Sequence, residues 1–190
     1  MAIPKKPRTC RVCKTVFQPV RYLQTVCSPE CAIKQAQAKR AKAERIAEAA
    51  DRKTIRIKRE ALKTRADWMR DAERAVNTYV RTRDKDKPCI SCGRFHEGQW
   101  HAGHYRSKGS APHLRFDAER NIFRQCAPCN TYLSGNLINY RAGLIARIGL
   151  KAVEELEADQ EPRKYSIAEL KEIKAHYIAK LKQLRGFQAK

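Results

Sequence analysis

The most constraining feature of the chain is the arrangement of its eight cysteines in four close pairs. A spacing of two or three residues lets both thiolates of a pair reach one metal ion, and two pairs complete a tetrahedral zinc site. The sequence therefore predicts two structural zinc ions, each held by four thiolates. The first site would be formed by Cys10, Cys13, Cys27 and Cys31, and the second by Cys89, Cys92, Cys126 and Cys129.

Composition indicates why a chain of this kind would need metal sites. Aromatic residues make up only 7% of the 190 residues and charged residues 32%, so a single thick hydrophobic core is not expected. A structural zinc ion can supply roughly 10–16 kcal/mol of apparent folding free energy, which compensates for a thin core. Thiol–disulfide chemistry would instead require an exposed reactive pair, and it would explain neither the charge nor the histidines of the chain.

The charge of the chain restricts its partners. Lys and Arg number 41 against 20 Asp and Glu, which gives a formal net charge of +21 and indicates a polyanionic partner. No stretch approaches the roughly 18 apolar residues of a membrane-spanning helix. Residues 1–8 are not followed by the apolar run of a secretory signal. We therefore expect no membrane association and a cytosolic location, where thiols stay reduced and can bind metal.

A long helix is expected directly after the first four cysteines. Ser28 followed by Pro29 is typical of a helix N-terminus, and residues 32–62 contain neither Gly nor Pro. Residues 32–65 carry 12 basic and 4 acidic side chains. We interpret this segment as a basic arm that lies along DNA phosphates, and the alternative is a solvated spacer helix.

Three further helical segments are predicted. One spans residues 66–83, and two shorter ones follow residue 137 and are separated by Gly149. The first has an apolar face made of Trp68, Ala72, Ala75, Val76, Tyr79 and Val80.

A last helix should begin at the capping box formed by Ser166 and Glu169. Its apolar stripe, which includes Leu170 and Tyr177, either covers the core of the chain or pairs with a second copy in a homodimer. These elements divide the chain into a cysteine knuckle, a basic arm, a core with the last two cysteine pairs and C-terminal helices, which correspond to residues 1–31, 32–65, 66–136 and 137–190.

The residues suited to chemistry lie between the last two cysteine pairs. His101 and His104 lie on a predicted short strand, Asn121 lies before the last pair, and Asn130 follows Cys129 at an expected helix start. Phosphodiester hydrolysis needs a base to activate water and a divalent ion to stabilise charge. A strand histidine facing a helix that carries an asparagine supplies both. The sequence therefore predicts a mostly helical α+β protein with a small ββα-metal core.

This order of residues resembles the zinc-stapled HNH, or ββα-metal, nucleases. The resemblance implies that His104 is the general base, that Asn121 orients it and that Asn130 binds the catalytic metal. The ending Cys-x2-Cys-Asn is similar to that of endonuclease VII, in which the asparagine after the last cysteine is a magnesium ligand.

Nearly the whole chain resembles the NinG (Rap) family of lambdoid phages. The resemblance implies an endonuclease in the cytosol of a bacterial host that cleaves branched recombination intermediates, such as four-way junctions and D-loops, with Mg2+ or Mn2+. Many members of the family have Asp where this chain has His101, and a neutral imidazole favours softer ions than magnesium. His101 is therefore either a ligand that changes the metal preference or no ligand. The matching segments read PCISCG, AGHYR, LRF, RNI, CNTYLSGNL and YSIAELKEIKAHY.

Other interpretations of these residues stay open from the sequence. Cys89 and Cys92 could bind zinc together with His101 and His104, or His104 could be a hydrogen-bonded core residue. A non-catalytic zinc protein that binds nucleic acid would show the same charge and cysteine pattern. Trp100 and Tyr105 are expected to pack under the strand. Phosphate contacts, or else solvated surface positions, are expected for Arg106, Lys108, Arg115, Arg120 and Arg124.

Overall fold

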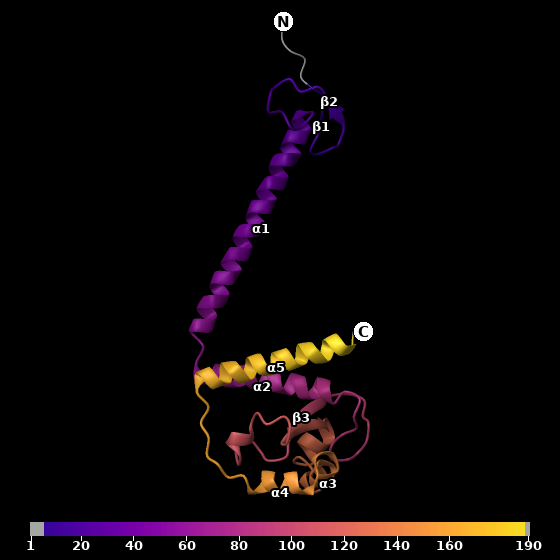
Figure 1. Cartoon of the computed structure of the whole chain (residues 1–190), viewed down its shortest axis with the longest axis vertical. Coiled ribbons are helices and arrows are strands. Elements are labelled where there is room, and N and C mark those ends of the chain that lie inside the picture. Colours follow the sequence, from indigo (N-terminus) through magenta and orange to yellow (C-terminus); the bar gives the residue numbers. More distant parts are fainter. Residues whose placement is uncertain (1–5, 189–190) are drawn as a thin grey trace. The chain divides into compact units, whose positions relative to one another are not determined.

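The computed structural model describes residues 6–188 and divides the chain into two compact units, Met1–Leu62 and Lys63–Lys190 (Figure 1). Residues 1–5 and 189–190, which the predicted first and last segments include, lie outside the described part. The protein is mostly helical with two small antiparallel sheets, which confirms the predicted α+β class. Within residues 6–188, no helix is both long and apolar enough to cross a membrane.

The first unit consists of a small hairpin followed by one long helix. Strand β1 (Arg8–Thr9) pairs antiparallel with β2 (Val16–Phe17), and α1 (Pro29–Ala61) follows. The helix begins where the sequence predicts, because the Ser28 hydroxyl accepts a hydrogen bond from the backbone N–H of Cys31. Cys31 is the only buried residue of α1. The rest of this helix is therefore stabilised by its intrinsic propensity rather than by packing.

The second unit is built around a two-stranded hairpin. Strand β3 (Trp100–His104) pairs antiparallel with β4 (Ile122–Cys126). The loop that joins them contains the 3-10 turn η1 (Pro112–Leu114), and β4 leads into the π-type turn η2 (Pro128–Tyr132). The end of β3 that carries His104 enters the loop, whereas its start lies opposite the cysteine end of β4.

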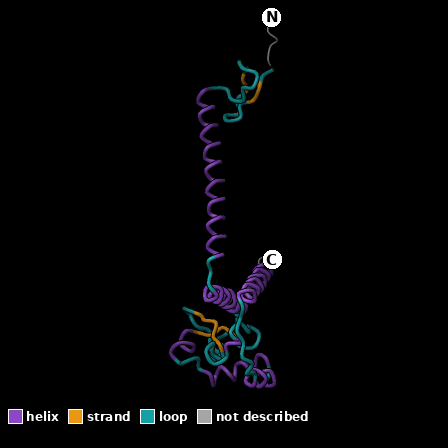
Figure 2. Tube along the Cα trace, turned by 90° about the vertical axis from the view of Figure 1, so that its left-hand side faces the viewer, coloured by secondary structure: helices purple, strands orange, loops and turns teal. Residues whose placement is uncertain are grey.

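Helices α2 (Arg65–Arg83) and α5 (Ile167–Gln188) lie side by side over this hairpin (Figure 1 and Figure 2). The predicted apolar face of α2 is buried, apart from a partly exposed Ala75. Leu170 and Tyr177 of α5 join the same core, with the rings of Tyr79 and Tyr177 at 5.2 Å. The apolar stripe of α5 therefore covers the core of this chain.

Helices α2 and α5 each have a capping box at the N-terminus. Ser166 and Glu169 form the predicted one at the start of α5, where the backbone N–H of Ser166 donates to the Glu169 carboxylate at 2.8 Å. Thr64 and Asp67 form a second one at the start of α2, which the sequence analysis did not single out.

Helices α3 (Leu137–Ile148) and α4 (Leu150–Ala158) cover the opposite side of the hairpin. They are separated at Gly149, whose φ of +85° ends α3 as predicted. Gly143 lets α3 lie directly against the loop of the third cysteine pair. A Cβ at this position would come within 2.0 Å of the carbonyl oxygen of Ile90.

Candidate metal centres and active site

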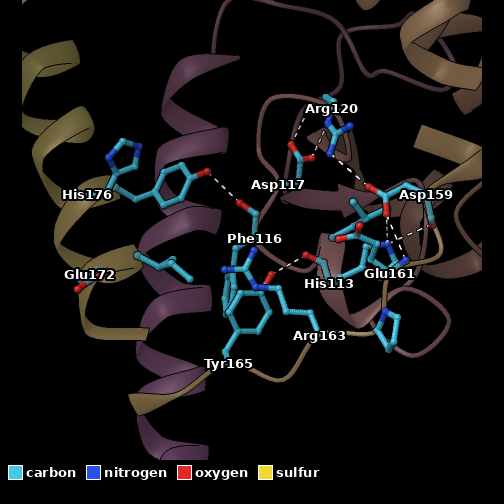
Figure 3. Close-up of a pocket in the computed structure, with 14 residues that line it drawn as sticks. His113, Phe116, Asp117, Arg120, Asp159, Glu161, Arg163, Tyr165, Glu172 and His176 are labelled. Carbon is cyan, nitrogen blue, oxygen red and sulfur yellow. Dashed lines mark hydrogen bonds and ion pairs between the residues drawn. The ribbon is translucent and has the colours of Figure 1, made fainter. Parts of the chain in front are cut away.

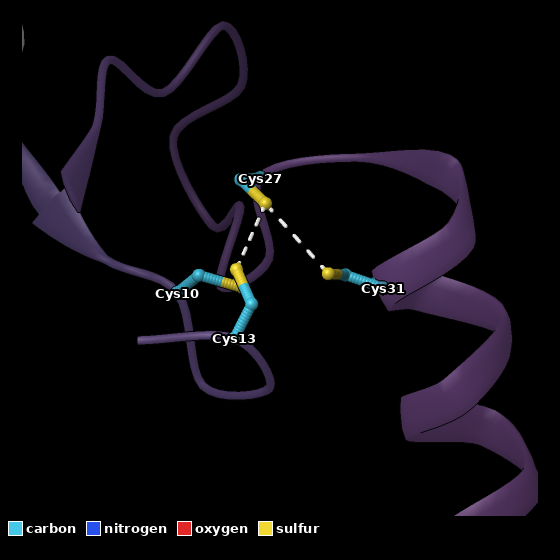
Figure 4. Close-up of side chains that lie close together, drawn as sticks. All are labelled: Cys10, Cys13, Cys27 and Cys31. Atoms are coloured by element: carbon cyan, nitrogen blue, oxygen red, sulfur yellow. Dashed lines mark hydrogen bonds between the residues drawn. The ribbon is translucent and has the colours of Figure 1, made fainter. Parts of the chain in front are cut away.

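Figure 4 shows the sulfur atoms of Cys10, Cys13, Cys27 and Cys31 converging beside the first turn of α1. All four lie within 4.8 Å of one another, with 3.4 Å between Cys13 and Cys27 and 3.7 Å between Cys27 and Cys31. A zinc ion bound tetrahedrally by thiolates at about 2.3 Å separates its sulfurs by about 3.8 Å. The four side chains therefore fit a structural zinc ion.

The sulfur atoms of Cys89, Cys92, Cys126 and Cys129 form a second group of the same size. The Cys92 and Cys126 sulfurs are 3.9 Å apart, and the backbone N–H of Cys126 donates to Cys89 at 3.4 Å. Because the third and fourth pairs converge, the alternative site of two cysteines and two histidines is wrong. Three of these thiols are buried, and Trp100 packs against them.

The two cysteine clusters begin with the same backbone turn. In the first, the N–H of Lys14 donates to the Cys10 carbonyl at 3.0 Å, and in the second the N–H of Gly93 donates to the Cys89 carbonyl at 2.9 Å. Lys14 and Gly93 occupy the left-handed region at φ +66° and +67°. Burial raises the pKa of the Cys10 thiol, but backbone N–H groups of the turn outweigh this effect and bring the pKa to about 6. The turn therefore favours the thiolate that zinc requires.

A buried carboxylate ties β4 to the helices around the second cluster. Asp84 is fully buried and accepts hydrogen bonds from the Arg83 side chain at 2.7 Å and from the backbone N–H of Arg124 at 3.1 Å. Arg147 of α3 lies 3.5 Å away. Burial raises the pKa of Asp84, but the contacts with Arg83 outweigh this and hold the pKa below its usual value. No pattern in the sequence singles out Asp84 as a buried residue.

His104 lies half-buried at the end of β3 and lines a cavity of about 820 Å³. Its Nε2 is 3.1 Å from the carbonyl oxygen of Arg115. A carbonyl can only accept, so Nε2 carries the proton and Nδ1 is left as an acceptor. Burial lowers the pKa of His104 below its usual value, although the Arg115 carbonyl opposes this shift. The neutral imidazole is therefore favoured at neutral pH.

Asn121 is fully buried, and its described hydrogen bonds hold the loop between the strands. Its amide nitrogen donates to the carbonyls of Arg106 at 3.0 Å and Leu114 at 3.1 Å, and its oxygen accepts from the Arg106 N–H at 2.7 Å. Leu114 directly precedes Arg115, whose carbonyl holds His104. Asn121 is therefore connected to His104 only through this loop in the hydrogen bonds described, and its orienting role stays a prediction.

His101 and Asn130 face each other across the start of the hairpin. The amide nitrogen of Asn130 lies 2.7 Å from Nδ1 of His101. Asn130 also lines both the cavity at His104 and a neighbouring cavity of about 500 Å³ that contains His101. In place of the expected helix at Asn130 the chain forms only the short turn η2. Three residues with positive φ, Ser134, Gly135 and Asn136, follow this turn.

Two residues of α2 reach this site without having been predicted. Asn77 and Arg81 line the smaller cavity together with His101 and Asn130, and Asn77 lines the larger one as well. The hydrogen bond described for the Arg81 side chain is a long one, 3.5 Å, to Thr78 of the same helix. Their spacing of four residues places them on one face of α2, a pattern that could have drawn attention to them.

Two of the predicted phosphate contacts lie beside His104 and share one carboxylate. Arg115 is 2.7 Å and Lys108 is 3.4 Å from Glu73 of α2. Lys108 lines the larger cavity, and 45% of its side chain is exposed. It remains a predicted phosphate contact.

The other three residues predicted to contact phosphate are arginines whose side chains also contact other parts of this chain. Arg106 donates to the Leu156 carbonyl at 2.9 Å, and Arg124 stacks on Trp100 at 3.5 Å from the ring centroid. Arg120 pairs with Asp117 at 2.7 Å in a separate cavity of about 750 Å³ (Figure 3). These contacts give each arginine a role in the fold, and their DNA contacts stay predictions.

Comparison with known proteins identifies the family to which the chain belongs. The family model described as "Bacteriophage Lambda NinG protein" matches residues 1–186. The chain belongs to the NinG family. NinG of Escherichia phage lambda is 44% identical over 199 residues, covering 98% of this chain and 97% of the relative. NinG of Salmonella phage P22 is 46% identical over 184 residues, covering 91% and 90%. No solved structure matches this NinG chain significantly.

Proposed function

We propose that this member of the NinG family is a metal-dependent endonuclease that cleaves branched DNA, such as four-way junctions and D-loops. The observation that carries the proposal is the state of His104. Its Nε2 is held by a backbone carbonyl, which leaves Nδ1 as an acceptor, and the residue lines a cavity large enough for a phosphodiester. Burial lowers the pKa of His104 and so favours the neutral ring. This is the arrangement that a general base for water requires. It also agrees with the resemblance to HNH nucleases.

In the proposed reaction, Nδ1 of His104 accepts a proton from the attacking water. The Arg115 carbonyl keeps the other nitrogen protonated, and Asn121 holds the loop that carries this carbonyl. Since Asn121 is buried, its contribution is to position His104 rather than to contact DNA.

His101 and Asn130 are the residues that would hold a catalytic divalent ion. When bound, the ion would stabilise negative charge on the phosphate. The pair offers an imidazole and an amide oxygen as ligands. Within residues 6–188, the groups of three or more His, Cys, Asp or Glu side chains that could hold a metal ion are the two cysteine clusters, and His101 belongs to neither. A ligand pair without a carboxylate favours Mn2+, Co2+ or Ni2+ over Mg2+.

Arg81 is suited to bind the phosphate beside this pair. It lines the same cavity, and no ion pair with a carboxylate is described for it, unlike Arg115 and Lys108. A guanidinium can contact two phosphate oxygens at once. The exposed basic side chains of α1 would add contacts with the DNA backbone that do not depend on sequence.

The proposal is tested by incubating the purified protein with labelled four-way, D-loop and linear DNA in Mg2+, Mn2+, Co2+ or Ni2+. We expect cleavage of the branched substrates, and His104→Ala should reduce its rate about 10²–10⁴-fold. His176→Ala is the matched control, because His176 is exposed and lines a different cavity. Equal rates for the parent and His104→Ala would refute the assignment of the base, and no cleavage with any metal would refute the nuclease.

A second function, a non-catalytic zinc protein that binds branched DNA, is favoured by one observation. Within residues 6–188, His101 belongs to no group of three or more His, Cys, Asp or Glu side chains that could hold a metal ion. This protein would bind junctions tightly and leave them intact, so the same assay separates the two functions.

A further inference from the structure

The first zinc unit displays apolar side chains that its small core does not use. Val20, Tyr22 and Leu23 lie in one loop between the second and third cysteines and are 80%, 77% and 80% exposed. We define residues 20–24 as the tip loop. Large apolar side chains gathered at one exposed position commonly mark a binding surface.

The tip loop has a defined conformation. The side-chain oxygen of Gln24 accepts the backbone N–H groups of Val20 at 2.8 Å and Arg21 at 3.3 Å, and its nitrogen donates to the Val26 carbonyl at 2.9 Å. The Arg8 side chain donates to the Gln24 carbonyl at 3.3 Å. The loop is therefore organised before any partner binds, which reduces the entropy lost on binding.

The segment that carries the tip loop is basic. Residues 6–31 contain five basic side chains, from Lys6, Arg8, Arg11, Lys14 and Arg21, and one acidic side chain, from Glu30. The Arg8 guanidinium lies 6.0 Å from the centroid of the Tyr22 ring. An apolar loop in a basic segment fits a partner that combines flat apolar faces with phosphates, which is the chemistry of an unstacked nucleotide.

We propose that Tyr22 and Leu23 pack against unstacked bases at the branch point of DNA. Duplex DNA hides the faces of its bases, whereas a junction or a displaced strand exposes them. The tip loop thereby supplies selectivity for branched structures, while the phosphate contacts of α1 are common to all DNA. This inference rests on the proposed DNA function and adds to it the residues that distinguish a branch from a duplex.

The test measures binding without catalytic divalent ions, so it does not depend on cleavage. A four-way junction carries 2-aminopurine at the branch point or within an arm, and a linear duplex of the same sequence serves for comparison. The Tyr22→Ala/Leu23→Ala double variant is compared with Val16→Ala, which removes an exposed apolar side chain of β2 outside the tip loop. Retained zinc shows that the variants are folded, and Tyr22→Trp tests whether another aromatic ring suffices.

We expect the double variant to bind the junction roughly 5- to 150-fold more weakly for each stacked base lost, with duplex affinity unchanged. The fluorescence change at the branch point should disappear, and Tyr22→Trp and Val16→Ala should behave as the parent. Equal losses on junction and duplex would overturn the inference, as would unchanged junction affinity. A dimeric parent that the double variant converts to a monomer, with DNA binding unchanged, would assign the loop to self-association instead. Failure of the parent to bind any DNA would overturn the proposed function itself.

Discussion

The two cysteine clusters share one turn geometry but differ in what surrounds them. At the first, the side chains of Val20, Tyr22 and Leu23 are exposed. At the second, Ile90 between the paired cysteines is 4% exposed and lies under α3 at Gly143. The same metal-binding unit thus supports an exposed loop in one place and forms part of a core in the other. The comparison predicts that the second cluster determines the fold of residues 63–190 and that the first cluster can be lost without unfolding them.

The largest effect is expected from replacing single cysteines. Cys126→Ser should unfold the unit at residues 63–190, because structural zinc supplies roughly 10–16 kcal/mol of apparent folding free energy. Cys10→Ser should leave that unit folded with its zinc and weaken DNA binding. Zinc content and thermal unfolding of both variants measure this difference. A loss of both zinc ions on Cys10→Ser would show that the clusters are not independent.

A smaller effect is expected where α3 meets the second cluster. Gly143→Ala places a Cβ within 2.0 Å of a backbone oxygen, so α3 must shift, at a cost of about 1–3 kcal/mol or more. Gly186→Ala in α5 is the matched control, because an added Cβ there has nothing within 4 Å. It should be neutral or stabilise by up to about 1 kcal/mol. Equal unfolding temperatures for the two variants would contradict the close contact.

The burial of the second unit also predicts a pH dependence. Burial lowers the pKa of His104, the Arg115 carbonyl and Glu73 raise it, and the charges of Lys108 and Arg115 lower it. His104 accepts a proton only when neutral, so cleavage should decline below a pH lower than the usual histidine value of about 6.5. Glu73→Gln should move the decline to still lower pH. A decline centred above 6.5 in the rate profile at saturating DNA would contradict this assignment.

His104 should also contribute to stability with a defined sign. Since its pKa is lower in the folded than in the unfolded protein, the unfolded chain binds more protons at pH values between the two pKa values. This contribution to the free energy of unfolding is fully present above about pH 6.5 and is lost as the pH falls through the lowered value. Urea unfolding of His104→Gln should show a weaker dependence on pH in this interval than the parent.

The smallest effect compares the turns of the two clusters directly. Lys14 and Gly93 have φ values of +66° and +67°, which side chains other than glycine adopt at a cost. Gly93→Ala should destabilise the second unit, and Lys14→Gly should stabilise the first, each by about 1 kcal/mol. Zinc-release midpoints in a chelator titration measure both. Changes of the same sign would show that the turns are not equivalent.

Several features could be predicted because their signals are local in the sequence. The cysteine spacings predict both metal clusters, Ser28 the start of α1, and Gly149 the break before α4. Capping and left-handed turns depend on a few neighbouring residues, so one sequence is sufficient to recognise them.

The rest of the site depends on packing between distant segments. Asp84 looks like part of a surface turn until β4 and α3 cover it. Nothing in the sequence indicates that the Arg115 carbonyl would meet His104. The spacing of Asn77 and Arg81 places them on one face of α2, but it does not indicate that this face would line a cavity with His101. The helix expected at Asn130 is a single turn, because three residues with positive φ follow it.

The most direct test of the account uses residues 63–190 alone, compared with the full chain on four-way and linear DNA. We expect this fragment to fold with one zinc ion and to cleave at saturating DNA at the rate of the full chain. It should bind all DNA more weakly and should lose the preference for branched over linear substrate. A folded, zinc-loaded fragment that cleaves nothing at saturating DNA, while the full chain cleaves, would contradict the division between a recognition unit and a catalytic unit.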